Sequence, residues 1–519
     1  MKIKYAAAAL AALSLSMSSC DDFLDTLPDN RTDLDTPEKV TKILVSAYPT
    51  VNWNLITEYY SDNTDDNSDR YQMYDRLSEE IYKWEDTRET GDDSPLTLWN
   101  TCYSAVAAAN QALQAIDRLG NGEDLQAQRG EALLCRAYGH FMLSYVFCNA
   151  WTESGKDTDM GIPYSTEPET TVRPQYDRET IGKTYEHIAA DLEEGLPLID
   201  DNNYDVPKYH FNRKAAYAFA ARFYLYYGKY DKAIECANVV LGEDPSLVLR
   251  DWDAIGKLSL NDDLQPNAYI DAAEPANLLL VTSRSWWGLY NGPLTVTCRY
   301  THNVTIANNE TCLSTGVWGP CNTTLRMQAA NYTSVPKVMF RKYPMFYFEV
   351  VDPAAGTGYY NIVQSAFNTD ETLLVRAEAY TMKKDYARAL ADMQAWQNAF
   401  TTSDVQLTTE AVNDFYGPIE YYTPEEPTVK KELHPDFAIE EGTQENMLHF
   451  ILHARRITTL HEGLRWGDIK RYGITVYRRT VDNRIITVTD TMLPDDPRRA
   501  VQIPHDVVQA GLPANPRNN

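Results

Sequence analysis

Aromatic side chains beside small polar residues give the strongest sign of a ligand site in this sequence of 519 residues. Tyrosine outnumbers phenylalanine by 35 to 14, and a ring with a polar tip suits a surface that binds amphipathic ligands. Sugars are such ligands, because their C–H faces stack on aromatic rings while their hydroxyls bond to polar groups. Trp286, Trp287 and Tyr290 form the densest cluster, and Trp318 lies in a glycine-bearing segment. We predict that these four residues bind a glycan; burial in a core is the competing interpretation for each Trp alone.

Residues suited to catalysis or metal binding form weaker patterns. His449 and His453 are spaced i,i+4, which would place both on one helix face. His461 precedes Glu462, but Arg465 stands where a zinc-protease motif requires a second His. The sequence has no Gly-x-Ser-x-Gly elbow, Walker loop or dinucleotide fingerprint, and its carboxylates are too numerous to single out a glycosidase pair. We predict no catalytic residue, no metal site and no cofactor.

Oxygen-bearing side chains alternate in an early acidic segment, residues 61–93. Asn63, Asp65, Asn67 and Asp69 follow the spacing of calcium ligands in a loop. The segment lacks the required Gly, and Tyr74 occupies the position of the bidentate acid. We therefore expect a solvated loop here rather than a calcium site.

Charge and cysteine content narrow the choice of partners and cross-links. A formal net charge of −27 argues against nucleic acid and anionic membrane surfaces as partners, and leaves neutral ligands open. Cys312 and Cys321 flank a glycine-bearing turn, so a disulfide and two free thiols both remain open. Four other cysteines lie in apolar helical contexts and are predicted to be buried: Cys102, Cys135, Cys148 and Cys236.

Two related helical stretches supply the scaffold that must position these residues. Residues 215–241 read as two helices joined at Gly228, where a positive φ would end the first helix. The same spacing of small and aromatic residues returns 156 residues later, so that Tyr230 corresponds to Tyr386. Such units bury their apolar faces by stacking, which predicts an all-α scaffold of about four tetratricopeptide-like helix pairs. Residues 242–368 lack the helical pattern and are predicted to form a long, irregular insertion.

The first twenty residues have the build of a secretory signal. A basic start is followed by an apolar run at 6–15, which is too short to span a bilayer. Ser18 and Ser19 directly precede Cys20, as in a lipoprotein cleavage box, so we predict that Cys20 is acylated and becomes the mature N-terminus. A secretory signal without lipidation is the alternative. No later apolar run approaches ~18 residues, so we expect lipid anchoring rather than a transmembrane helix.

A distinctive motif lies near the C-terminus, where residues 461–471 read HEGLRWGDIKR and follow Arg455 and Arg456. It resembles the signature of the SusD/RagB family, outer-membrane lipoproteins that bind nutrients for uptake. Residues 20–24, 376–380 and 502–504 fit the same family, so the resemblance covers essentially the whole mature chain. The motif also offers ion pairs that would fasten the last helix to the scaffold, formed by Arg456, Arg465 and Arg471 with Glu462 and Asp468. Contact of these arginines with a ligand is the alternative.

The resemblance implies a surface-exposed protein that captures an oligosaccharide and delivers it to a SusC-like TonB-dependent outer-membrane transporter. Because family members also recruit ligand contacts from an early loop, Trp84 and Tyr71 are added to the predicted rim of the site. Peptide binding, as in the RagB branch, and a surface glycoside hydrolase are the alternatives. The predicted organisation is a signal peptide at 1–19, a SusD-like helical region at 20–241 and a RagB/SusD region at 242–519, which contains the insertion 242–368.

Overall fold

The computed structural model describes residues 34–72, 74–169, 176–260, 262–292, 298–332, 335–345, 347–483 and 485–517. Cys20 and the predicted signal lie outside these residues. Helices dominate the described part: α3 (Pro37–Leu44), α4 (Asn54–Tyr60), α5 (Arg76–Tyr82), α6 (Pro95–Arg118), α7 (Gln126–Phe147), α8 (Ile181–Gly195), α9 (Arg213–Tyr226), α10 (Tyr230–Leu241), α11 (Trp252–Gly256), α12 (Leu264–Tyr269), α13 (Trp287–Tyr290), α14 (Val304–Glu310), α15 (Cys321–Thr324), α16 (Thr369–Met382), α17 (Tyr386–Phe400), α18 (Thr409–Tyr416), α19 (Thr443–Thr458), α20 (Arg465–Arg471) and α21 (His505–Gln509). Within the described ranges, no helix combines the length and apolarity needed to cross a membrane.

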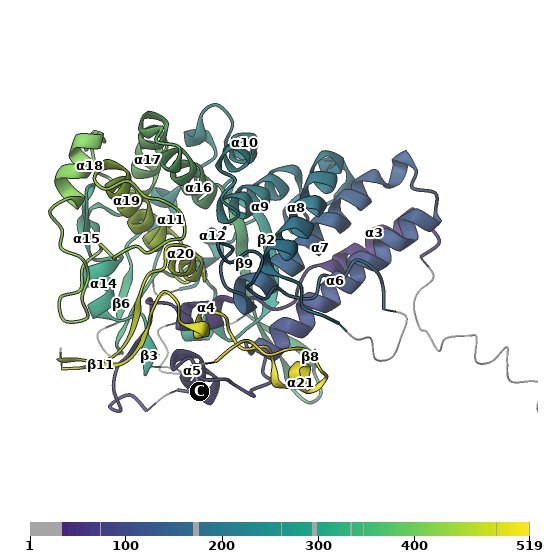
Figure 1. The fold of residues 1–519 in the computed structure, drawn as a ribbon, viewed down its shortest axis with the longest axis horizontal. Coiled ribbons are helices and arrows are strands. Elements are labelled where there is room, and N and C mark those ends of the chain that lie inside the picture. Colours follow the sequence, from purple (N-terminus) through teal and green to yellow (C-terminus); the bar gives the residue numbers. More distant parts are fainter. Residues whose placement is uncertain are drawn as a thin grey trace, which may run out of the picture.

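The long helices follow one another across the molecule, from α3, α6 and α7 at one end to α17 and α19 at the other (Figure 1). Sequence signals set their ends: Ser94 caps α6 by accepting a hydrogen bond from the Thr97 backbone nitrogen at 3.2 Å, and Pro95 follows. Helix α7 packs closely on α6, because a Cβ at Gly139 would lie 2.8 Å from Val106 Cγ2. Thr180 caps α8 by accepting a hydrogen bond from the Lys183 backbone nitrogen.

The two repeated units are the helix pairs α9–α10 and α16–α17. Gly228 ends α9 with φ of 69°, and Lys384 holds φ of 60° at the equivalent point after α16. Glycine reaches this conformation without strain, whereas the lysine adopts it at a cost. Helix α10 packs directly on α16, so the units are neighbours in space despite the long insertion between them. The helix-rich scaffold is thereby confirmed, and its relation to tetratricopeptide repeats remains a prediction.

The insertion is more regular than the sequence suggested. It contributes strands to several small sheets, together with segments from both ends of the chain: β1 (Asp65–Asp66), β2 (Asn277–Arg284), β3 (Tyr300–Thr301), β4 (Thr315–Gly316), β5 (Gly319–Pro320), β6 (Ala330–Tyr332), β7 (Lys337–Met339), β8 (Phe348–Asp352), β9 (Thr357–Asn368), β10 (Val476–Asp482) and β11 (Ile485–Met492).

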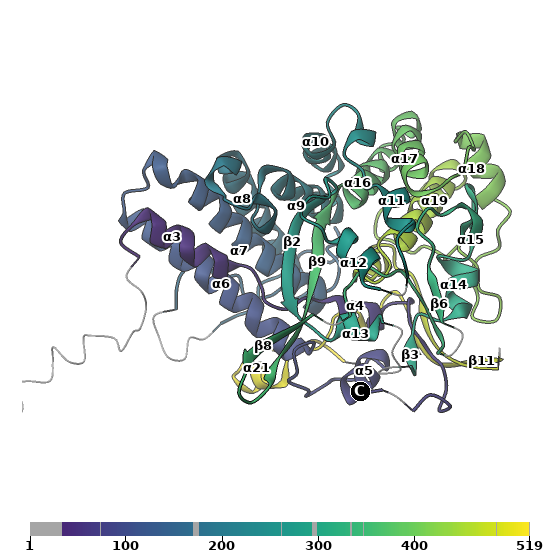
Figure 2. The ribbon, with the colours of Figure 1, turned by 180° about the vertical axis from the view of Figure 1, so that it is seen from behind.

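A three-stranded sheet with the order β2-β9-β8 covers the side of α9 that faces the viewer in Figure 2. Phe367 of β9 is fully buried against Phe219 of α9, with ring centroids 5.5 Å apart. Strand β9 then leads directly into α16, so the sheet is joined to the second repeated unit. A second sheet, ordered β11-β10-β1-β3, joins the early segment, the insertion and the C-terminal region.

Candidate functional site

Three of the predicted ligand residues lie in the core. Trp287, Trp318 and Trp84 are at most 3% exposed. The Trp287 indole nitrogen donates to the His461 carbonyl at 2.9 Å, and that of Trp84 donates to the Tyr60 carbonyl at 3.1 Å. These rings present no face to a ligand, so the prediction that they form a stacking platform is corrected. Burial, the competing interpretation for single tryptophans, describes them.

Trp286 differs from its neighbour, because 41% of it is exposed. Its ring lies 4.7 Å from that of Tyr360, which in turn lies 5.0 Å from that of Phe348 (centroid distances). Phe348 and Tyr360 are directly paired across β8 and β9 and therefore share one face of the sheet. We call Trp286, Tyr360 and Phe348 the aromatic ledge. Sequence reasoning found only Trp286 among them.

The backbone of Trp286 is held by a buried carboxylate from the early acidic segment. Asp93 accepts hydrogen bonds from the Trp286 backbone nitrogen at 2.8 Å and from Ser285 Oγ at 2.6 Å. Burial raises the pKa of Asp93 to about 7, although both hydrogen bonds act in the opposite direction. The Ser285 backbone nitrogen donates to the Tyr360 carbonyl at 3.0 Å, which ties this segment to β9. The ledge is therefore built on fixed backbone.

The early segment also meets Tyr290. The Tyr290 hydroxyl donates to the carboxylate of Asp75, the residue that caps α5. Nearby, the Arg299 guanidinium lies 5.2 Å from the centre of the Tyr74 ring and pairs with Asp66 at 3.0 Å. The structure thus brings residues 66, 74–75 and 93 of the early segment next to residues 285–290 and 299. Tyr71 is half-buried in this loop, and no described ring stacks on it.

The start of the early segment is not a solvated loop. Residues 61–68 are all buried, and several of their side chains form ion pairs or hydrogen bonds. Asp65 receives two hydrogen bonds from the Arg479 guanidinium, each 2.9 Å long, and Asn67 donates to the Thr301 hydroxyl at 2.8 Å. The guanidinium group of Arg479 thus occupies the carboxylate oxygens of Asp65 that a bound metal cation would require. No group of three or more His, Cys, Asp and Glu residues within the described ranges is arranged to hold a metal.

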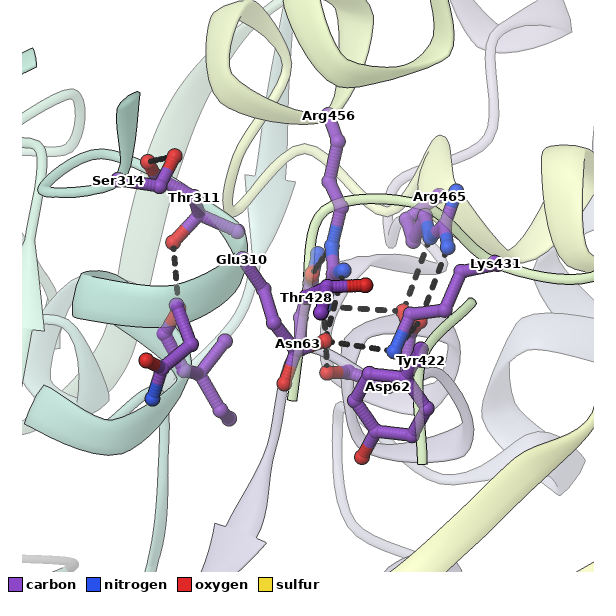
Figure 3. Close-up of polar contacts among 12 residues, drawn as sticks. Asp62, Asn63, Glu310, Thr311, Ser314, Tyr422, Thr428, Lys431, Arg456 and Arg465 are labelled. Carbon is purple, nitrogen blue, oxygen red and sulfur yellow. Dashed lines mark hydrogen bonds and ion pairs between the residues drawn. The ribbon is translucent and has the colours of Figure 1, made fainter. Parts of the chain in front are cut away.

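Around Asp62 the signature arginines form a buried charge cluster (Figure 3). Arg465 binds both carboxylate oxygens of Asp62 at 2.9 Å, and Arg456 pairs with Glu310 at 3.0 Å. Lys431 adds a further pair with Glu310 at 2.7 Å. Burial alone would raise the pKa of Glu310, but these cations outweigh it and hold that pKa at about 2.

A second buried cluster centres on Glu378 of α16. Arg455 and Arg471 both pair with its carboxylate, Arg471 at 2.7 Å, and the Tyr472 hydroxyl donates to it at 2.6 Å. The signature thus fastens the C-terminal helices to the second repeated unit, as the structural interpretation expected. The partners differ from those we predicted, because Arg465 and Arg456 pair with Asp62 and Glu310 rather than with Glu462. Glu462 instead pairs with Lys342 at 3.0 Å.

The remaining reactive side chains are also engaged or buried. His453 uses both ring nitrogens, one with Ser314 at 2.9 Å and one with Tyr416 at 3.0 Å, which leaves none for a metal. Cys312 and Cys321 are free and buried, so the disulfide that the sequence left open does not form. The four other cysteines are buried, as predicted: Cys102, Cys135, Cys148 and Cys236.

Comparison with known proteins shows what the chain is similar to. Residues 22–225 match a family described as "Starch-binding associating with outer membrane". The structure is similar to that of a SusD superfamily protein from Bacteroides thetaiotaomicron, with a TM-score of 0.63 and 18% sequence identity. The similarity covers 94% of this chain and all of the other protein. These matches support the resemblance to the SusD/RagB family that the sequence indicates.

Two further proteins are similar to this chain. A putative sugar binding protein from Bacteroides vulgatus matches 94% of this chain over 99% of its own length, with a TM-score of 0.62 and 19% identity. SusD-like protein P2 from Formosa agariphila is 26% identical over 170 residues, which are 31% of this chain and 30% of that protein. The match thus spans about a third of this curated relative. The chain shares its fold with these solved structures over 94% of its length, whereas the family match covers residues 22–225 and does not include the C-terminal motif.

Proposed function

We propose that this SusD-like protein captures an oligosaccharide at the cell surface and passes it, uncleaved, to a SusC-like TonB-dependent transporter. The aromatic ledge carries the proposal, because exposed rings at fixed positions match the apolar faces of successive sugar units. Phe348 is 39% exposed beside Trp286, although large aromatic rings are usually buried. A rigid aromatic surface loses little conformational entropy on binding, which favours modest affinity from few contacts.

Family and relatives support a saccharide over other ligands. The family is described as starch-binding, and two similar structures are titled a putative sugar binding protein and a SusD-like carbohydrate binding protein. The net charge of −27 is compatible with a neutral ligand. Acylation of Cys20, outside the described residues, would anchor the protein at the outer membrane, with which the family is described as associating. Modest affinity suits a protein that must release its ligand to a transporter.

The test is calorimetry with neutral oligosaccharides on the purified protein that starts at Asp21. The panel contains maltohexaose, cellohexaose, xylohexaose and mannohexaose, and short peptides serve as the competing ligand class. We expect binding to at least one saccharide and its loss in Trp286→Ala. Selective binding of peptides would favour the RagB-like alternative, and hydrolysis of the saccharide during titration would contradict capture without chemistry.

A further inference from the structure

A cleft of about 560 Å³ lies between α6, the segment after Cys148 and the C-terminal residues around α21. Its volume is in the range of small-molecule sites. Helix α21 lies at the same end of the molecule as the β8–β9 hairpin in both views (Figures 1 and 2). None of the residues that line the cleft belongs to the aromatic ledge.

One face of α6 forms the floor of the cleft. Asn100, Ser104, Ala107 and Gln111 follow one another at intervals of four, three and four residues, which places them on one side of the helix. No described residue forms a hydrogen bond with the side-chain amide of Asn100 or Gln111. The floor thus presents donors and acceptors that are ready for a ligand.

Aromatic rings flank these amides. Trp99 and Tyr103 line the cleft with ring centroids 5.1 Å apart, and Tyr176 stands on the opposite wall with 39% exposure. Glu169, which accepts a hydrogen bond from the Tyr176 hydroxyl, and Asp177 also line it. None of the described residues that line the cleft is Lys or Arg. Rings, amides and carboxylates together suit a neutral, hydroxyl-rich ligand.

The walls of the cleft are fixed to one another. The Tyr103 hydroxyl donates to the Pro163 carbonyl at 2.8 Å, which joins floor and wall. Arg178 donates to the Gly161 carbonyl at 2.7 Å and to the Pro513 carbonyl at 3.0 Å, and so links the two walls. Such preorganisation lowers the entropic cost of binding.

We infer that this cleft is a second saccharide-binding site, which takes a neutral unit of the oligosaccharide whose capture is proposed above. The inference rests on that proposed function for its class of ligand, but on different residues. Tyr176 stacks on the sugar ring, while Asn100 and Gln111 bond to its hydroxyls. A lost stack and a lost hydrogen bond, each of about 1 kcal/mol, together correspond to at least tenfold weaker binding.

The experiment is isothermal titration of the full mature chain with the four hexasaccharides named above. It compares wild type, the double variant Gln111→Ala/Tyr176→Ala and the control Tyr209→Ala, a tyrosine of similar exposure (43%) outside the cleft. We expect two binding sites in wild type and the control, and one in the double variant. If the double variant keeps both the number of binding sites and their affinities, the inference that the cleft binds a saccharide is wrong.

Trp286→Ala separates this inference from the proposed function. If Trp286→Ala removes one site and the double variant removes the other, both assignments stand. If binding depends only on Trp286, the inference that the cleft binds a saccharide is wrong and the proposal for the ledge stands. If binding depends only on Gln111 and Tyr176, the proposal that the ledge binds a saccharide is wrong and the inference for the cleft stands. Failure of all four saccharides to bind wild type overturns both. Unfolding curves of each variant verify that the fold is kept.

Discussion

At the scale of single residues, burial separates two adjacent tryptophans. Trp287 is enclosed and hydrogen-bonded to the His461 carbonyl, whereas Trp286 is exposed on the ledge. We predict that Trp287→Ala lowers the free energy of unfolding by about 3–5 kcal/mol, because a large ring leaves a cavity. Trp286→Ala should lower it by less than about 1 kcal/mol. Urea denaturation of both variants measures this difference, and a larger loss in Trp286→Ala would contradict the assignment.

The buried carboxylate of Glu378 makes a distinct prediction. Burial would raise its pKa, but Arg455 and Arg471 outweigh that effect and hold the pKa at about 2. Glu378→Gln leaves Asp468 as the only remaining carboxylate partner of Arg455 and Arg471 among the described residues, and we expect a loss of about 3–5 kcal/mol in unfolding free energy at pH 7.

The pH dependence of that loss follows from the pKa. An unfolded glutamate titrates near pKa ~4.3, so the unfolded chain takes up a proton before the folded one does. The stabilisation by Glu378 is therefore complete above about pH 4.3 and is lost as the pH falls towards 2. Unfolding curves of wild type and Glu378→Gln should converge over this range. A constant difference between pH 7 and the lowest pH at which the chain folds would exclude the ion pairs as its source.

At the scale of elements, the two repeated units invite a matched test. Tyr230 and Tyr386 occupy equivalent positions, and both are half-buried. The loss of about 3–5 kcal/mol expected for a fully buried ring is therefore reduced to about 1.5–2.5 kcal/mol for each Tyr→Ala variant. Chemical denaturation should give values that agree within about 0.5 kcal/mol. A large difference between the two would show that the units pack differently.

Helices were more predictable from the sequence than sheets. The apolar spacing and the glycine at 228 are local signals, and they located α9, α10, α16 and α17 correctly. Strand β2 instead finds its partner β9 about 80 residues later, and no local pattern records that pairing. The aromatic ledge was missed for the same reason, since Phe348 and Tyr360 become neighbours of Trp286 only through the sheet.

The buried ion pairs were also hard to predict from the sequence. The acids at 62–66 looked like a solvated loop, because their arginine partners lie about 400 residues away in sequence. The Arg-rich motif near residue 465 was recognisable, and its structural role was predicted correctly. Asp468 was predicted as an acidic partner and lies 2.8 Å from Arg455 and 3.9 Å from Arg471. The other acidic partners were missed, because nearby Glu462 offered a shorter alternative in the sequence. The buried charge cluster around Asp62 was therefore missed because its members are far apart in the sequence.

At the scale of the whole molecule, the lipid anchor is a prediction in its own right. Residues before 34 lie outside the described part, so the expectation rests on Ser18, Ser19 and Cys20 in the sequence. Cys20→Ala removes the thiol that would be acylated, and we expect the protein to leave the outer-membrane fraction or to stay unprocessed. Membrane fractionation with immunodetection measures this. Unchanged co-fractionation with the outer membrane would rule out the anchor.

Calorimetry on the mature chain tests glycan capture at the ledge most directly. Wild type and Trp286→Ala are titrated with the hexasaccharide that binds best, with the exposed Tyr209→Ala as control, and the recovered sugar is analysed for cleavage. We predict that Trp286→Ala weakens ledge binding by about five- to twelvefold, because a stacked ring contributes roughly 1–1.5 kcal/mol. The control should match wild type, and the sugar should be recovered intact. Equal affinity at every site in wild type and Trp286→Ala, or recovery of shortened sugar, would contradict capture at the ledge without chemistry.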